Sequence, residues 1–241
     1  VMGKVAGEAL YSAEQTAPRL GAAARARVGP SFMAVLAHLH SIDPEAVGLG
    51  DLGRHDGYVA RQLRTWYGSW TASAAAADYD DERLHALHDR LVAEIPEQGP
   101  ARVVHGDYGV HNVMIDHSGE VAAVLDWEIG TLGDPLADFA YALNAWTEPS
   151  DGSNAASGAP TALPGFASRE ELIADYAERT GADLSELGYY RSFNSFKTAC
   201  IVHGVYARFR RGMKSTDGVD MPGLFERMVM SIELAERHLA G

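Results

Sequence analysis

Two groups of polar residues in the middle of the chain have the types and spacing that phosphoryl-transfer chemistry needs. The run His105 to Asn112 places Asp107 five positions before Asn112, and a second carboxylate, Asp126, follows two short apolar stretches. One carboxylate that orients a hydroxyl, with an amide oxygen and a second carboxylate that hold Mg²⁺, is the set such a reaction uses. The order of these residues therefore predicts a phosphoryl-transfer site.

Short strands are expected to hold these polar residues in place. Apolar residues at 113–115 and 121–125 flank a turn at Ser118 and Gly119, which predicts a hairpin that ends on Asp126. Another short strand at 102–104 should lead into the polar run. Asp and Asn are common turn formers, so each polar residue alone has a plain structural explanation. Their joint order favours the catalytic interpretation.

The same region resembles the catalytic core of the aminoglycoside phosphotransferase and choline kinase family, which is related to the protein kinases. The resemblance rests on residues 105–112, 126–128 and 133–140. Segments at 36–44, 61–66 and 189–197 resemble the kinase-like domains found fused to acyl-CoA dehydrogenases. This resemblance implies an α+β, mainly α fold: the helical C-terminal lobe of a protein-kinase-like phosphotransferase, with a small β-hairpin carrying the catalytic and metal-binding segments.

The resemblance also implies a role for each polar residue. Asp107 stands at the position of the catalytic aspartate, which orients or deprotonates the attacking hydroxyl, and Asn112 and Asp126 stand at the positions that hold Mg²⁺. Trp127 is interpreted as a packing residue. These roles imply a nucleoside triphosphate, ATP or GTP, as the phosphoryl donor.

Three further residues are expected to support the site. His105 is expected to pack beneath the metal site rather than to act as a general base, and Glu128 is expected to be an outer-sphere acid. Asp138 is expected to turn back and hold the backbone of the catalytic loop; alternatively, it is a first-turn carboxylate that interacts favourably with the helix dipole.

Family members bind the nucleotide between an N-terminal β-lobe, which carries a glycine-rich loop and a lysine, and the helical lobe. Residues 1–10 resemble the hinge that joins these lobes, so we expect residues 1–241 to be the C-terminal lobe, with the nucleotide-binding β-lobe absent. The run Gly48 to Gly53 fits the pattern G-x-G-x-x-G. It follows a helix rather than a strand and contains Asp51, so a plain loop is expected there.

Helices are expected over most of the remaining chain. Apolar spacing predicts helices from Pro30 to Ile42, at 59–70, 84–95, 185–211 and 224–239, a helix capped by Asp134, and another that begins with a capping box at residues 168–171. Residues 148–167 are rich in Gly, Ser, Asn, Pro and Ala and are expected to form a mobile surface loop. No internal repeat and no second domain is apparent.

The substrate pocket is the least defined part of this interpretation. By analogy with the family, the helices of the lobe would form it, although aromatic residues at helical spacing more often belong to the core. The candidates are Trp66, Tyr67, Trp70, Tyr190 and Arg208. His85 and His88 share a helical face, but no further ligand at suitable spacing supports a zinc site.

Composition narrows the classes of partner. The net charge of −13 over 241 residues argues against nucleic acid or an anionic membrane as the main partner, because both need a basic surface. A single cysteine, Cys200, excludes an intrachain disulfide and fits a reducing compartment, so a cytoplasmic location is expected. The expected partner is a small molecule with a hydroxyl group; the sequence does not define the oligomeric state.

Three functional classes remain open. The first is a kinase that phosphorylates a hydroxyl of a small molecule, with a hydroxyacyl thioester suggested by the dehydrogenase-fused relatives. The second is a catalytically inactive binding lobe, since the glycine-rich loop and the strand lysine are missing. The third is a metal-dependent phosphoesterase, which would need several more metal ligands than the sequence offers near residue 107.

Overall fold

The chain forms two compact units in a computed structural model that describes residues 3–152 and 158–240. The first unit contains Val1–His55 and Pro100–Leu184, and the second contains Asp56–Gly99 and Ser185–Gly241. Each unit thus combines two separate stretches of the chain. The sequence analysis identified no second domain and none of these crossing points.

The strands of the first unit form two antiparallel pairs. Strand β1 (Arg102–Val104) pairs with β4 (Thr131–Gly133), with Val103 opposite Leu132. Strand β2 (Val113–Ile115) pairs with β3 (Val121–Val124), with Val113 opposite Val124. The predicted hairpin and the strand before the polar run are therefore confirmed, and both ends of that run are anchored in strands.

The turn between β2 and β3 depends on two residue types. The Asp116 Oδ1 atom accepts hydrogen bonds from the backbone N–H groups of Ser118 (2.8 Å) and Glu120 (3.0 Å). Gly119 has a φ of +95°, and a Cβ atom there would clash with the carbonyl oxygen of Ala24. Only glycine fits both the backbone conformation and the space, so the hairpin is set closely against helix α2.

Helices α1 (Ala13–Thr16), α2 (Ala22–Ser41), α5 (Pro135–Ala145) and α7 (Arg169–Thr180) complete the main elements of the first unit. The predicted start of α2 at Pro30 is wrong, because the helix begins eight residues earlier, at Ala22. Alanine-rich sequence favours helix, and Pro30 lies on an exposed position where water can satisfy the carbonyl group that loses its partner.

Two predicted helix starts are confirmed. The Asp134 side chain accepts a hydrogen bond from the backbone N–H of Leu136, and Pro135 occupies the first turn of α5. Ser168 and Glu171 form a reciprocal capping box at the start of α7. The start of α5 matters for the site, since it fixes where Asp138 lies.

The segment at 148–167 is more regular than its composition predicted. It contains the 3₁₀ turns η2 (Pro149–Asp151) and η3 (Pro160–Ala162); residues 153–157 lie outside the described residues. Thr161 is buried and hydrogen-bonds both the N–H and the carbonyl group of Thr147, while Arg169 forms ion pairs with Glu148 and Asp151. Arg169 lies beyond the segment, so composition alone could not reveal these contacts.

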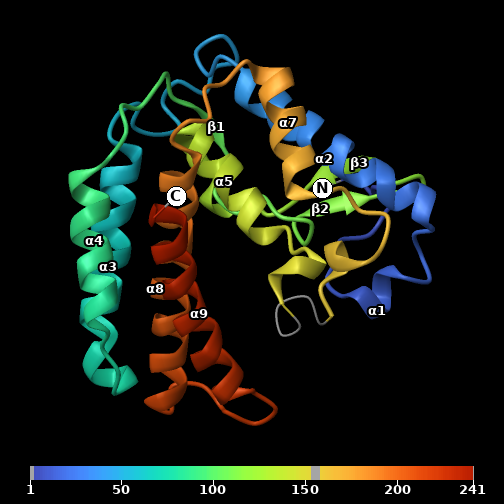
Figure 1. The fold of residues 1–241 in the computed structure, drawn as a ribbon. Helices are drawn as coiled ribbons and strands as arrows, with labels where there is room; N and C mark the ends of the chain where they lie inside the picture. The colour runs from blue at the N-terminus through green and yellow to red at the C-terminus, as the bar shows by residue number, and fades with distance from the viewer. Residues whose placement is uncertain (1–2, 153–157, 241) are drawn as a thin grey trace. The chain divides into compact units, whose positions relative to one another are not determined.

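The second unit consists of helices α3 (Tyr58–Ala77), α4 (Glu82–Ala93), α8 (Leu187–Arg210) and α9 (Met221–Ala240). All four were predicted; the ends of α4, α8 and α9 differ from the prediction by one to three residues, whereas α3 continues seven residues beyond its predicted end at residue 70. Figure 1 shows α3 beside α4 and α8 beside α9. Helix α8 also packs on both α3 and α4, which explains why its apolar residues follow no single stripe.

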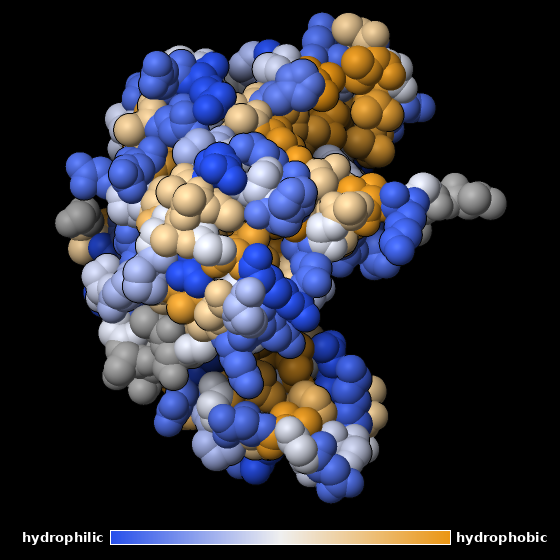
Figure 2. Space-filling model, turned by 90° about the vertical axis from the view of Figure 1, so that its right-hand side faces the viewer, coloured by the Kyte–Doolittle hydropathy of each residue, from blue (hydrophilic) through white to orange (hydrophobic). Residues whose placement is uncertain are grey.

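Hydrophilic side chains cover much of the face drawn in Figure 2, and separate hydrophobic patches interrupt them. The acidic excess of the sequence is consistent with such a surface. Among residues 3–152 and 158–240, no helix combines the length and the apolar composition that crossing a lipid bilayer requires. The first unit also contains an apolar pocket beside the candidate site.

Candidate active site

The predicted catalytic loop spans the eight residues between β1 and β2, and a carboxylate from α5 holds its backbone. Asp138 is almost completely buried. Its Oδ2 atom accepts a hydrogen bond from the backbone N–H of His105 (2.7 Å), and Oδ1 accepts one from the N–H of Gly106 (2.8 Å). These two bonds confirm the expectation that Asp138 turns back onto the loop.

His105 connects the catalytic loop to the end of β3. Its Nε2 atom lies 2.7 Å from the carbonyl oxygen of Leu125, which can only accept, so Nε2 carries the hydrogen. Nδ1 then accepts a hydrogen bond from the backbone N–H of Asp107 (3.2 Å). With both ring nitrogens engaged with the backbone and the ring buried, the geometry agrees with the structural role predicted for His105.

The side chain of Asp107 is held on both oxygens. Its Oδ1 atom accepts a hydrogen bond from the Tyr141 hydroxyl on α5 and lies 3.6 Å from His111 Nε2. Its Oδ2 atom accepts one from the Asn112 amide nitrogen (2.9 Å), which also donates to the Asp107 carbonyl oxygen (2.9 Å). The carboxylate therefore has a fixed orientation while about a third of its surface, 34%, stays open to solvent.

These contacts make Asp107 a stronger acid. Burial, the largest influence, raises the pKa of its carboxyl group, but the polar contact with His111, the hydrogen bonds from Tyr141 and Asn112 and the charge of His111 outweigh it and lower the pKa from 3.8 to about 2. Asp107 is therefore ionised at neutral pH. An ionised carboxylate with a low pKa is a good hydrogen-bond acceptor for a hydroxyl and a weak base.

Asn112 and Asp126 have the chemistry expected of magnesium ligands. Because the Asn112 nitrogen faces Asp107, the amide oxygen is the atom left for a cation. The backbone N–H of Leu125 donates to the Asn112 carbonyl oxygen (2.8 Å), which places Asp126 next to this residue in the fold. An amide oxygen and a carboxylate match the few protein ligands that Mg²⁺ takes beside phosphate and water oxygens, so the residues fit the ion.

Asp126 has an unusual backbone conformation. Its φ of +59° and ψ of +60° lie in the left-handed region, and it begins the 3₁₀ turn η1 (Trp127–Ile129) with an exposed side chain. Such a conformation costs a residue other than glycine of order 1–3 kcal/mol, and such strain concentrates at functional sites. Glu128 is exposed on the same turn. Across residues 3–152 and 158–240, no group of three or more His, Cys, Asp and Glu side chains is arranged to hold a metal ion.

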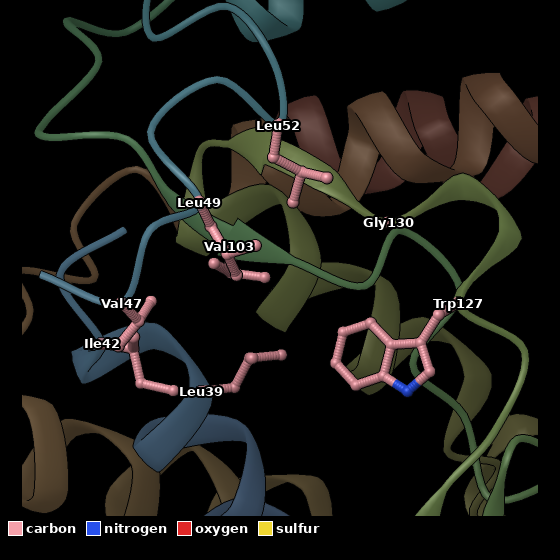
Figure 3. Close-up of a pocket in the computed structure, with 8 residues that line it drawn as sticks. All are labelled: Leu39, Ile42, Val47, Leu49, Leu52, Val103, Trp127 and Gly130. Carbon is pink, nitrogen blue, oxygen red and sulfur yellow. The ribbon is translucent and has the colours of Figure 1, made fainter. Parts of the chain in front are cut away.

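An apolar pocket of about 400 Å³ lies beside the site (Figure 3). The indole of Trp127 forms one wall, and its ring centroid is 4.8 Å from that of His105. Trp127 thus contacts the catalytic loop, which is consistent with its interpretation as a packing residue, but it is 43% exposed and also faces the pocket. The other lining residues come from α2, from the loop after it, from β1 and from the position directly before β4: Leu39, Ile42, Val47, Leu49, Leu52, Val103 and Gly130.

The Gly48 to Gly53 run contributes to this pocket rather than to a phosphate loop. It lies among turns, with no strand before it and no helix directly after it. A Cβ atom at Gly53 would clash with the Thr131 hydroxyl, so this glycine allows the loop to pack against β4. The predicted plain-loop interpretation agrees with this arrangement.

The five candidate substrate residues all belong to the second unit. Trp70 (0% exposed) and Tyr190 (2%) are core residues, and the Trp70 ring stacks on His203 at 3.8 Å. Trp66 and Tyr67 are half-buried, and Tyr67 stacks on His88 at 3.8 Å, while Arg208 is exposed. For Trp70 and Tyr190, the core interpretation is the one that burial favours; substrate contact by the others stays a prediction.

Sequence reasoning missed several residues at the site. Tyr141 lies three residues after Asp138, which puts both on the loop-facing side of α5, so helical spacing was the one signal that could have found it. His40 and Tyr176, which adjoin Asp138, come from α2 and α7. No spacing within the sequence connects residues so far apart.

Comparisons with known proteins identify the family of the chain. Residues 1–187 match the model of the phosphotransferase enzyme family, APH, so the chain belongs to this family. It is 34% identical to the chicken (Gallus gallus) acyl-CoA dehydrogenase family member 11 over 209 residues, which cover 83% of this chain and 26% of that protein. The chain thus spans about a quarter of this curated relative.

Solved structures show the same fold. A Ralstonia eutropha protein assigned to the aminoglycoside phosphotransferases superposes with a TM-score of 0.82 at 29% identity, covering 98% of this chain and 72% of that one. Choline kinase from Cryptosporidium parvum gives a TM-score of 0.57 at 12% identity over 95% of this chain and 70% of that one, which is a likeness of fold alone. The predicted family and the α+β, mainly helical fold are confirmed, and membership supports a small-molecule phosphotransferase.

Proposed function

We propose that this chain orients the hydroxyl group of a small molecule for phosphorylation by a nucleoside triphosphate, ATP or GTP. The observation that carries the proposal is the orientation of Asp107. Tyr141 and Asn112 hold its two carboxylate oxygens, and Asp138 holds the loop from which it projects. One partly exposed carboxylate, fixed in this way, can receive a hydroxyl in a single orientation.

In the proposed reaction, the acceptor hydroxyl donates a hydrogen bond to Asp107. The bond from the γ-phosphorus to the leaving nucleoside diphosphate breaks, the bond to the acceptor oxygen forms, and the hydroxyl proton passes to Asp107. The low pKa of Asp107 makes it a weak base, so its main contribution is to align the hydroxyl. This fits the loose transition state of phosphoryl transfer, in which positioning matters more than deprotonation.

Asn112 and Asp126 would hold Mg²⁺, which when bound neutralises charge on the triphosphate. Asn112 would contribute its amide oxygen, and Asp126 its exposed carboxylate. Because His105 and Asn112 both bind the backbone at Leu125, they keep Asp126 beside the loop that orients the acceptor. Glu128 would act as an outer-sphere acid.

We propose that the acceptor has an apolar portion, as in a hydroxyacyl thioester. Two observations support this class: the apolar pocket at Trp127 and the similarity to proteins named as acyl-CoA dehydrogenase family members. A pocket lined by aliphatic side chains and one indole binds a hydrocarbon chain better than it binds an aminoglycoside, which is a sugar with several positive charges. We also propose a cytoplasmic location, where the donor nucleotide is available.

The test is phosphate transfer from ATP and GTP by the natural protein that contains this chain, with hydroxyacyl thioesters and aminoglycosides as competing acceptors. Asp107→Asn should lower kcat by roughly 10²- to 10⁴-fold. Asp89→Asn is the matched control, because Asp89 is an exposed helix residue with a comparable His neighbour, His88. Equal turnover by Asp107→Asn and the wild type would remove Asp107 from the mechanism.

The other two functional classes give different outcomes in the same assay. A binding lobe would bind Mg-ATP in calorimetry without any transfer. A phosphoesterase would release phosphate from monoesters without a nucleotide. A two-metal phosphoesterase needs several ligands around two ions, and the described part of the chain offers no cluster of three acidic, histidine or cysteine ligands to build on.

A further inference from the structure

Beneath the catalytic loop lies a buried hydrogen-bonded chain that the proposed mechanism does not use. His40 belongs to the segment at 36–44 that the sequence analysis singled out, and its side chain is only 2% exposed. Its Nε2 atom lies 3.2 Å from Asp138 Oδ2, and its Nδ1 atom lies 2.7 Å from the Tyr176 hydroxyl. These hydrogen bonds link Tyr176 on α7 to His40 on α2, and His40 to Asp138 on α5.

The position of the Asp138 carboxylate controls the loop. A buried carboxylate needs hydrogen-bond donors for its two oxygens, since an unpaired charge in the protein interior is costly. Two donors are the backbone N–H groups of His105 and Gly106, which belong to the loop itself, and the third is His40. Of these three donors, His40 is the one that lies outside the loop, so it can hold the carboxylate independently of the loop.

Tyr176 in turn fixes the imidazole of His40. Its phenol ring stacks on Phe139 with centroids 3.8 Å apart and planes 7° apart, and it meets the His40 ring edge-on. Both Tyr176 and Phe139 are almost fully buried. The Tyr176 hydroxyl is therefore a rigid point, and its bond to Nδ1 directs Nε2 toward Asp138.

We propose that His40 and Tyr176 are positioning residues that aim the Asp138 carboxylate at the catalytic loop and thereby set the orientation of Asp107. The effect on the rate rests on the proposed function, whereas the effect on the loop does not. If the two residues only filled the core, their loss would loosen the whole first unit. If they position the loop, their loss should loosen the backbone at residues 105 and 106 and lower kcat.

The experiment uses Tyr176→Phe, which keeps the ring stacking and removes the hydroxyl, and His40→Ala with His40→Gln as the conservative variant. Tyr189→Phe is the matched control, because Tyr189 is a buried tyrosine of the second unit whose hydroxyl also makes one hydrogen bond, to the Leu91 carbonyl. Amide hydrogen exchange is measured for the loop and for β2 and β3, together with kcat and KM for the nucleotide.

Tyr176→Phe should speed amide exchange in the loop by roughly 3- to 10-fold, which is the change expected from losing the net stabilisation of one hydrogen bond. Exchange in β2 and β3 should not change. The same variant should lower kcat by a similar factor at constant KM, and should have no further effect in an Asp107→Asn background. His40→Ala should lower kcat by roughly 10²-fold, the cost of about 1 Å of misplacement, and His40→Gln should restore part of it.

Unchanged loop exchange in both Tyr176→Phe and His40→Ala would overturn the proposal. Equal acceleration across the loop, β2 and β3 would also overturn it, because that is the result of a purely structural role. If the wild type transfers no phosphate at all, the proposed function fails, and the exchange measurement still decides whether His40 and Tyr176 position the loop.

Discussion

Asp138→Asn is a near-isosteric change that removes the charge from the centre of this network. The wild-type carboxylate accepts from two loop amides and from His40, at 2.7, 2.8 and 3.2 Å. An asparagine can accept on one atom only, so its amide nitrogen must face either the Gly106 N–H, in place of Oδ1, or both His40 and the His105 N–H, in place of Oδ2. At least one donor is then left buried without an acceptor.

The free-energy cost follows from these bonds. An unsatisfied buried donor costs about 1–3 kcal/mol, and a hydrogen bond to a charged group contributes about 1.5–3 kcal/mol. The two effects overlap, because both describe the same lost pairing, so we expect the free energy of unfolding to fall by about 2–4 kcal/mol. For a protein of this size, that corresponds to a fall in Tm of roughly 10 °C.

The pH dependence of this difference is specific to Asp138. Burial, the largest influence, raises the pKa of its carboxyl group, but His40 and the amides of His105 and Gly106 outweigh it and hold the pKa below the ordinary 3.8. A lowered folded pKa gives stability that is present above the unfolded pKa and lost as the pH falls through the folded pKa. The difference from Asp138→Asn should therefore stay constant above about pH 5 and shrink below about pH 4.

The assay is denaturant unfolding of the wild type and Asp138→Asn between pH 8 and pH 3, with Asp89→Asn as an exposed control. A variant as stable as the wild type at pH 7 would refute the argument from unsatisfied donors. A difference that stays constant down to pH 3 would refute the assignment of the charge to Asp138.

Two other changes test the metal segment and the hairpin. Asp126→Gly should raise the Mg²⁺ concentration needed for half-maximal transfer, and unchanged Mg²⁺ dependence would exclude Asp126 as a ligand. The same change should leave Tm unchanged or higher, because it relieves about 1–3 kcal/mol of left-handed backbone strain. This relief exceeds the entropic cost of introducing glycine, about 0.5–1 kcal/mol. Gly119→Ala should destabilise the protein clearly more than Gly152→Ala in thermal melts, since both glycines have φ near +95° but, among residues 3–152 and 158–240, only the first has a backbone oxygen in the way; equal melting temperatures would show that the hairpin can move away from α2.

Local patterns were sufficient to predict the framework of the site. The loop from His105 to Asn112, the hairpin after it and the start of α5 at Asp134 each depend on residues within a few positions of one another. Turn formers, capping residues and alternating apolar positions act at this range. The position of Asp138 followed from the helix start, and its bonds to the loop were predicted because the family resemblance supplied the missing long-range contact.

The contacts that complete the site come from parts of the chain far apart in sequence. Tyr141 reaches Asp107 across 34 residues, and Tyr176 reaches His40 across 136. The contacts of Thr161 with Thr147 were missed for the same reason, since composition alone does not show which residues meet. Periodicity shows which residues are buried but not which buried residues meet. Those pairings exist only once the helices have packed and each buried polar group has found its partner.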